Sequence, residues 1–355
     1  MPVGNGERPV NLPHGTKSAL RSLAASWSHG LWSSLPLTRG TVRILTYHRV
    51  LPAQALRSEF VQPGMYVTDA SLERHVAYLG REFQILSVGE LLDLWDTGSW
   101  DSRERYCVIT FDDGWADTFR YAFPVLRSHR LPATVFLPTA YIGTARWFWP
   151  DRLGYLLMQA GVAARDVQLA VRSSLAQRID SLEMPRGARW RETSDGIIER
   201  CKQLPSEVVE EMIEEAGRRA GITFPSDRCL LSWEEVDAMG KQGISFGSHS
   251  ATHRILTRLT QEEIRFELES SLATLRDHNV NMVSAIAYPN GDTNAAVAGF
   301  AQLAGYRAGF TTKAGSEAPV PGDRFALRRI GVHEDISRTT SLFSFHVSRP
   351  RRGQG

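Results

Sequence analysis

Residues 107–114 read CVITFDDG, a short apolar run that ends in two carboxylates and a glycine. A continuous apolar run of this length indicates a strand buried on both faces, as in a parallel sheet. Successive strand side chains point to opposite sides, so Asp112 and Asp113 cannot both enter the core. Because function in α/β folds gathers at the carboxyl ends of strands, this stretch suggests both the fold and the place of a site.

Similar runs of β-branched and aromatic residues occur on both sides of this strand. They lie at 42–47, 133–137, 244–246, 285–288, 307–310 and 327–330, and helical patterns separate them. Such alternation predicts a parallel sheet covered by helices, either as a barrel or as an open sheet. Thr260 and Glu263 form a capping box that predicts a helix after the 244–246 strand.

The strand rhythm stops between Asp151 and Leu231. Within this part, residues 204–221 place apolar side chains on one face of a helix, and Gly221 is a plausible stop. We therefore expect a barrel domain over 41–345 with a helical insertion at about 152–230, and a flexible tail over 346–355. The 1–40 segment has an amphipathic pattern that predicts a helix, either packed on the domain or lying on a membrane surface.

The composition excludes several classes of protein. Among 355 residues, 42% are hydrophobic and 23% charged, which rules out a disordered chain, a collagen and a coiled coil. The net charge of +2 provides no polybasic field for nucleic acid. Three widely spaced cysteines form neither a disulfide framework nor a cysteine zinc site. With no secretory signal pattern, we expect a cytoplasmic protein, with peripheral membrane contact through the N-terminal helix as an alternative.

A pair of histidines follows the 244–246 strand. His249 and His253 stand at i and i+4, which over one helical turn lets two imidazoles reach one ion. With a carboxylate of the Asp112–Asp113 pair they supply three ligands and leave a position for water, as in catalytic zinc sites. The other carboxylate can then act as a general base. For either motif alone, a solvated turn is the alternative interpretation.

Two further strand ends carry candidate residues. Residues 287–292 read AYPNGD, where the bend after Tyr288 exposes backbone N–H groups, and one near Asn290 can donate to an oxyanion. An ordinary tight turn is the alternative. After the 327–330 strand, His333 is a candidate general acid or a structural histidine. Trp115 can stack on a sugar face, although tryptophans in apolar surroundings usually belong to the core.

Three motifs together resemble the polysaccharide deacetylase family, carbohydrate esterase family 4 with its NodB homology domain. They are TFDDGW at 110–115, SHSATH at 248–253 and AYPNGD at 287–292, in the family's order. The resemblance implies a distorted (β/α) barrel of about seven parallel strands around one divalent metal ion. It also implies that Asp113, His249 and His253 hold this ion and that Asp112 is the base. Zinc is the expected ion, with cobalt, nickel and manganese as alternatives.

The implied reaction is removal of an N-acetyl or N-formyl group from an amino sugar in glycan or polysaccharide biosynthesis. With no signal pattern, a lipid-linked or nucleotide-linked sugar is the expected substrate. Hydrolysis of an O-acetyl ester on a sugar is an alternative, because an ester and an amide need the same groups. A catalytically silent glycan-binding barrel is another, although intact Asp112, Asp113, His249 and His253 argue against it.

One departure from the family concerns the arginine that orients the catalytic aspartate in many members. The third motif of this chain contains no arginine. The first and last strands of a closed barrel are neighbours, so Arg328 or Arg329 can replace it, and alternation directs one of the two inward. His48 follows the first strand, and we assign it no role as a metal ligand.

Overall fold

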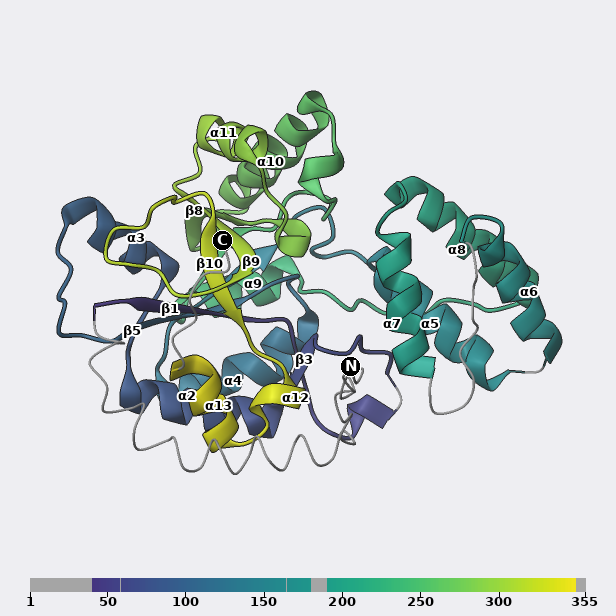
Figure 1. Cartoon of the computed structure of the whole chain (residues 1–355), viewed down its shortest axis with the longest axis horizontal. Coiled ribbons are helices and arrows are strands. Elements are labelled where there is room, and N and C mark those ends of the chain that lie inside the picture. The colour runs from purple at the N-terminus through teal and green to yellow at the C-terminus, as the bar shows by residue number, and fades with distance from the viewer. Residues whose placement is uncertain (1–39, 58, 164, 180–189, 349–355) are drawn as a thin grey trace, which may run out of the picture.

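The computed structural model describes residues 40–57, 59–163, 165–179 and 190–348 (Figure 1). Seven parallel strands form a closed barrel, and each overlaps one of the seven predicted runs. Around the barrel they follow the order β1 (Val42–Tyr47), β10 (Leu327–Gly331), β9 (Ala308–Ala314), β8 (Met282–Ala287), β7 (Ile244–Ser248), β6 (Ala133–Leu137) and β5 (Tyr106–Phe111). Since β5 pairs with β1 over six residues, the barrel prediction is confirmed.

The barrel is uneven beside β5. The short strand β4 (Gln84–Leu86) pairs with the first half of β5, and β6 pairs only with its last two residues. Two further short strands, β2 (Arg49–Leu51) and β3 (Tyr66–Thr68), form a separate parallel pair. None of these three strands was predicted, because three residues are too few to show a periodic pattern.

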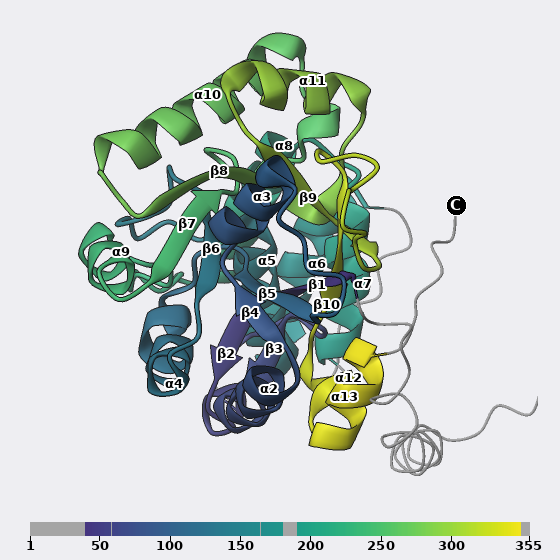
Figure 2. The same cartoon turned by 90° about the vertical axis from the view of Figure 1, so that its left-hand side faces the viewer.

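Helices surround the barrel (Figure 2). They are α2 (Asp69–Glu82), α3 (Val88–Thr97), α4 (Phe123–His129), α9 (Trp233–Gly240), α10 (Gln261–Asp277), α11 (Ala295–Ala304), α12 (Glu334–Ser337) and α13 (Thr340–Ser348), with single turns at Ala55–Arg57, Thr118–Ala122, Leu256–Arg258 and Pro289–Gly291. The predicted capping box is confirmed, because the Thr260 side chain accepts from the backbone of Glu263 and the Glu263 carboxylate accepts from the backbone of Thr260. Strand and helix side chains such as Ile44, Val108 and Leu91 share one fully buried cluster.

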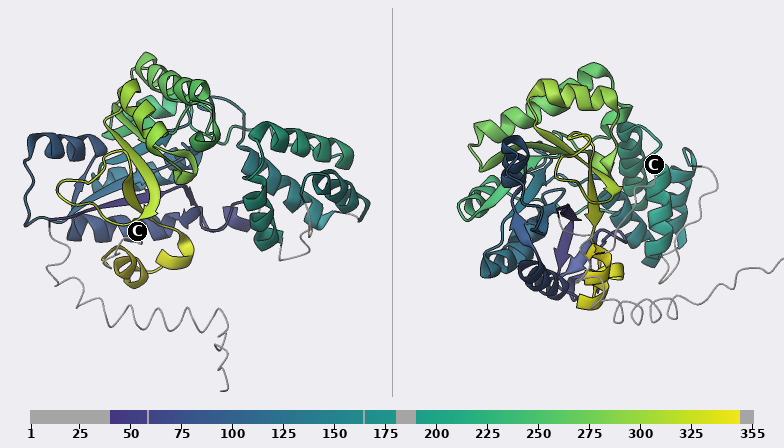
Figure 3. Two further views of the ribbon diagram at one scale, coloured as in Figure 1. Left: turned by 45° about the horizontal axis from the view of Figure 1, so that its top comes forward. Right: turned by 60° about the vertical axis from the view of Figure 1, so that its left-hand side comes forward.

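Four helices between β6 and β7 lie beside the barrel (Figures 1 and 3). They are α5 (Trp149–Val162), α6 (Arg165–Ala176), α7 (Trp190–Cys201) and α8 (Ser206–Ala220). Apolar side chains such as Leu157, Ile198 and Ile213 form a cluster separate from the barrel core, which Phe60 joins from outside these helices. Helix α8 is the one that the sequence pattern predicts, and it ends at Gly221, whose φ of 65° suits a glycine stop.

Parts of the predicted organisation lie outside the described residues. The N-terminal amphipathic helix falls within residues 1–39, and most of the predicted tail falls within residues 349–355. In the described part of the chain, none of the helices combines the length and the apolar character needed to cross a bilayer.

Candidate active site

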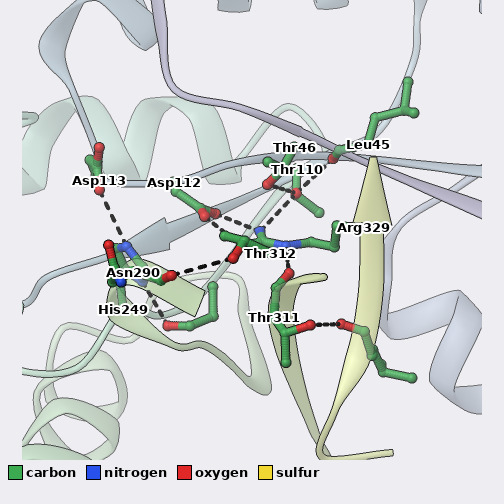
Figure 4. Close-up of polar contacts among 12 residues, drawn as sticks. Leu45, Thr46, Thr110, Asp112, Asp113, His249, Asn290, Thr311, Thr312 and Arg329 are labelled. Carbon is green, nitrogen blue, oxygen red and sulfur yellow. Dashed lines mark hydrogen bonds and ion pairs between the residues drawn. The ribbon is translucent and has the colours of Figure 1, made fainter. Parts of the chain in front are cut away.

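Asp113, His249 and His253 come together where β5 and β7 end. Figure 4 shows Asp113 facing His249. Oδ1 of Asp113 lies 3.2 Å from Nε2 of His249 and 3.2 Å from Nε2 of His253. Asp113 and His249 are buried, and His253 is partly exposed. The three predicted ligand groups therefore face one point at the carboxyl end of the barrel.

The chemistry of these donors fits a divalent metal ion. Nδ1 of His249 lies 2.6 Å from the carbonyl oxygen of Ala287, which can only accept a hydrogen bond. Nδ1 must therefore carry the proton, so Nε2 has a free lone pair toward Asp113. Two imidazoles and one carboxylate form the donor set of catalytic zinc sites, which keep a further position open. Asp113, His249 and His253 would hold such an ion.

The prediction of a helical turn between His249 and His253 is wrong. Residues 249–255 have no regular structure, and Ser250 and His253 adopt left-handed backbone conformations with φ of 61° and 59°. The imidazoles therefore converge through a sharp loop. The Ser250 hydroxyl accepts a hydrogen bond from the backbone N–H of His253 at 3.0 Å, which holds this loop.

Backbone strain is concentrated in this region. Asp113 and Asn290 are also left-handed, with φ of 72° and 60°. For residues with a side chain, each such conformation costs roughly 1–3 kcal/mol and persists only where the surroundings impose it. The buried carboxylate of Glu267 supplies part of this constraint, because it accepts from the backbone N–H groups of Ala251 and Thr252 at 2.9 and 2.8 Å.

Asp112 forms a buried ion pair with Arg329 (Figure 4). The guanidinium donates to Oδ1 at 2.8 Å and to Oδ2 at 2.7 Å, and both side chains are almost fully buried. Nε of Arg329 donates to the carbonyl oxygen of Thr311 at 2.9 Å. Of the two arginines that the sequence offers, Arg329 points inward, whereas Arg328 pairs with Glu317 at 3.1 Å.

The ion pair sets the protonation of Asp112. Burial alone would raise the pKa of its carboxyl group, but the charge of Arg329, aided by His249 and by the paired hydrogen bonds, lowers this pKa below its ordinary value. Asp112 is therefore ionised at neutral pH. An ionised carboxylate beside a metal-binding group can accept a proton from water.

A cavity of about 460 Å³ opens over these groups. Asp112, Asp113 and the two histidines border it, and residues 202–207 of the helical insertion border it from another side. Nζ of Lys202 donates to Oδ1 of Asn290 at 3.2 Å, which connects the insertion to the end of β8. The insertion thus lies beside the site without adding an imidazole, because residues 152–230 contain no histidine.

Three other predicted residues have different surroundings. Tyr288 is among the residues that border the cavity, but its side chain is buried in the apolar cluster with residues of α10 and α11, and its contact with a substrate stays a prediction. Trp115 is only 4% exposed, and its indole N–H donates to Asp113. His333 precedes α12, with its Nδ1 3.5 Å from Asp335, and it is not among the residues that border the cavity.

The contact between Trp115 and Asp113 was not predicted from the sequence. A signal for it exists, because Trp115 follows Asp113 by two residues across Gly114, which is a spacing that a tight turn can close. Asp113 and Gly114 are both left-handed, with φ of 72° and 65°. These two residues fold the tryptophan back onto the aspartate.

We expect Gly291→Ala to disturb the turn that carries Asn290. Gly291 has a φ of 77°, and an added Cβ would lie 2.1 Å from Oγ1 and 2.5 Å from the backbone nitrogen of Thr312. The backbone nitrogen cannot move aside, so we expect a loss of about 1–3 kcal/mol in the free energy of unfolding, measured with urea. Gly299→Ala is the matched control: it lies in α11 with open space around it, so it should be neutral or slightly stabilising. Equal unfolding midpoints for the two variants would contradict this expectation.

Comparison with known proteins gives one consistent result. The polysaccharide deacetylase family matches residues 100–309. A curated protein named as a polysaccharide deacetylase, YxkH of Bacillus subtilis (strain 168), is 22% identical over 295 residues, which cover 83% of this chain and 72% of that protein.

Solved structures share the fold. The Streptococcus pyogenes deacetylase PplD, in complex with acetate, has a TM-score of 0.55 and 17% identity, over 88% of this chain and all of that one. IcaB from Ammonifex degensii has a TM-score of 0.54 and 16% identity, over 86% and 97% of the two chains. A de-N-acetylase from Aggregatibacter actinomycetemcomitans has a TM-score of 0.53 and 13% identity, over 86% and 99%.

Proposed function

Because this chain belongs to the polysaccharide deacetylase family, we propose that it is a metal-dependent hydrolase that removes an N-acetyl or N-formyl group from an amino sugar. Family membership supports a hydrolase that deacetylates a sugar. The observation that carries the finer proposal is the arrangement of Asp112, ionised by Arg329, next to the Asp113, His249 and His253 group. One of the structures with the same fold is itself described as a de-N-acetylase.

The residues divide the chemistry among them. When bound, a divalent ion would polarise the acyl carbonyl and lower the pKa of water. Asp112 accepts the proton of the attacking water, and Arg329 keeps its carboxylate charged and aimed. The backbone around Asn290, at the edge of the cavity, is suited to donate an N–H to the developing oxyanion. The general acid role of His333 stays a prediction.

The substrate is tested by measuring acetate and formate release from a panel of acylated sugars. The panel holds N-acetyl, N-formyl and O-acetyl sugars, each as the free sugar, an oligomer, a nucleotide-linked form and a lipid-linked form. We expect release from at least one N-acylated member, and the preferred carrier identifies the substrate class. Release from O-acetyl sugars alone would show an esterase. Binding of a sugar without any release would show a silent glycan-binding barrel.

A further inference from the structure

The two carboxylate oxygens of Asp113 have different partners. Oδ1 faces Nε2 of both His249 and His253 at 3.2 Å. Oδ2 accepts the indole N–H of Trp115 at 3.0 Å. Both Asp113 and Trp115 are buried, with 5% and 4% of their surface exposed. One oxygen is thus directed toward the metal-binding point while the other is already hydrogen-bonded.

The indole ring of Trp115 is held on several sides. The guanidinium of Arg49 lies 4.5 Å above the ring centroid. Nε of Arg49 donates in turn to Oδ2 of Asp117 at 2.7 Å, and Oδ1 of Asp117 accepts the backbone N–H of Val50 at 3.0 Å. The ring of Phe148 meets the indole edge-on, with 5.6 Å between centroids. The arginine therefore cannot swing away from the ring without breaking a buried ion pair.

The backbone around Trp115 is fixed as well. Trp115 forms an isolated antiparallel bridge with Leu230, close to the end of the helical insertion. On either side of it, the backbone N–H of Leu231 donates to the carbonyl of Gly114 at 2.8 Å, and the N–H of Ala116 donates to the carbonyl of Cys229 at 2.9 Å. Residues 114–116, which precede the insertion, and residues 229–231, at its end, therefore hold each other in place. This contact fixes the backbone that carries the indole ring.

A carboxylate can bind a metal ion through one oxygen or through two. The indole N–H occupies one lone pair of Oδ2, so two-oxygen binding by Asp113 would have to share this oxygen between the ion and the indole or leave the buried indole N–H without a partner. We propose that Trp115 is a positioning residue that limits Asp113 to a single ligand oxygen, Oδ1. The remaining positions on the ion are thereby kept for water and the acyl oxygen. This inference rests on the metal site of the proposed function.

The test uses Trp115→Phe, which keeps an aromatic ring under Arg49 and removes the N–H. Zn²⁺ affinity is measured by competition with a chromophoric chelator, and the visible absorption of the Co²⁺-loaded protein reports the coordination of the ion. We expect the Zn²⁺ Kd to rise by about 10–100-fold, as for other outer partners of metal ligands. The Co²⁺ bands should weaken, since a higher coordination number lowers their intensity. Thermal unfolding of the metal-free protein should change little.

Trp147→Phe is the matched control, because it also removes an indole hydrogen bond, to the carbonyl oxygen of Asp227 at 3.1 Å, but at a partly exposed position. It should bind Zn²⁺ as the wild type does. If Trp115→Phe does not fold, Trp115→Met places a flexible apolar side chain without an N–H in the site and should show the same change in Kd and spectrum. A wild-type Kd and Co²⁺ spectrum in the folded variant would overturn the inference. A wild-type protein that binds neither Zn²⁺ nor Co²⁺ would instead overturn the proposed function.

Discussion

Asp112→Asn is expected to lower kcat by about 10²–10⁴-fold while the protein binds the same amount of metal. Asparagine has nearly the shape of aspartate, but its amide cannot accept a proton from water. Asp112 is outside the group of Asp113, His249 and His253, so metal binding should survive. Acetate release and the metal content of the purified protein measure the two effects separately.

The same variant leaves the buried guanidinium of Arg329 without its counter-charge. Removing one partner of a buried ion pair costs about 3–5 kcal/mol, so the fold must be checked by thermal unfolding with each activity measurement. Asp335→Asn is the matched control, because this carboxylate is 65% exposed and borders no part of the cavity. A folded Asp112→Asn protein with wild-type turnover would show that another group is the base.

Arg329→Met is expected to destabilise the protein and to shift its pH profile. It leaves the carboxylate of Asp112 buried and unpaired, at a cost of about 3–5 kcal/mol in the free energy of unfolding. Without the guanidinium, burial raises the pKa of Asp112, so the base becomes protonated at a higher pH. The acidic limb of kcat/KM should therefore move toward neutral pH.

The sign of the stability effect can be tested in the same series. The folded wild-type protein holds the pKa of Asp112 below its ordinary value, so the ion pair stabilises the fold above the ordinary pKa and this contribution is lost as the pH falls through the lowered one. The stability difference between wild type and Arg329→Met should therefore shrink in acid. Arg328→Met is the control, because Arg328 pairs with Glu317 instead of Asp112, and it should leave the acidic limb of kcat/KM where it lies in the wild type. An unmoved acidic limb in Arg329→Met would contradict the role given to this arginine.

The barrel strands could be predicted because their signal is local. Buried parallel strands are continuous apolar runs, and each of the seven predicted runs overlaps a barrel strand, to within one residue at the ends of 285–288 and 307–310. Barrel closure and side-chain alternation predicted that one of Arg328 and Arg329 points inward, and only the structure identifies it as Arg329.

The fine geometry of the site could not be predicted in this way. The approach of His249 and His253 depends on left-handed residues in a loop held by the carboxylate of Glu267, which lies 14 residues after His253 in the sequence. The contact of Trp115 with Asp113 depends on two consecutive left-handed residues. Such conformations are imposed by tertiary contacts rather than by local preference, so no periodic pattern in the sequence reveals them.

We propose that one divalent ion, held by Asp113, His249 and His253, is required for deacylation. It is tested most directly by removing all metal from the wild-type protein with a chelator and titrating Zn²⁺ back while acetate release from the preferred N-acetyl sugar is followed. We expect no release without metal and full release at one ion per chain, with no recovery in His253→Ala at the same concentrations. Release by the metal-free protein at the wild-type rate would contradict it.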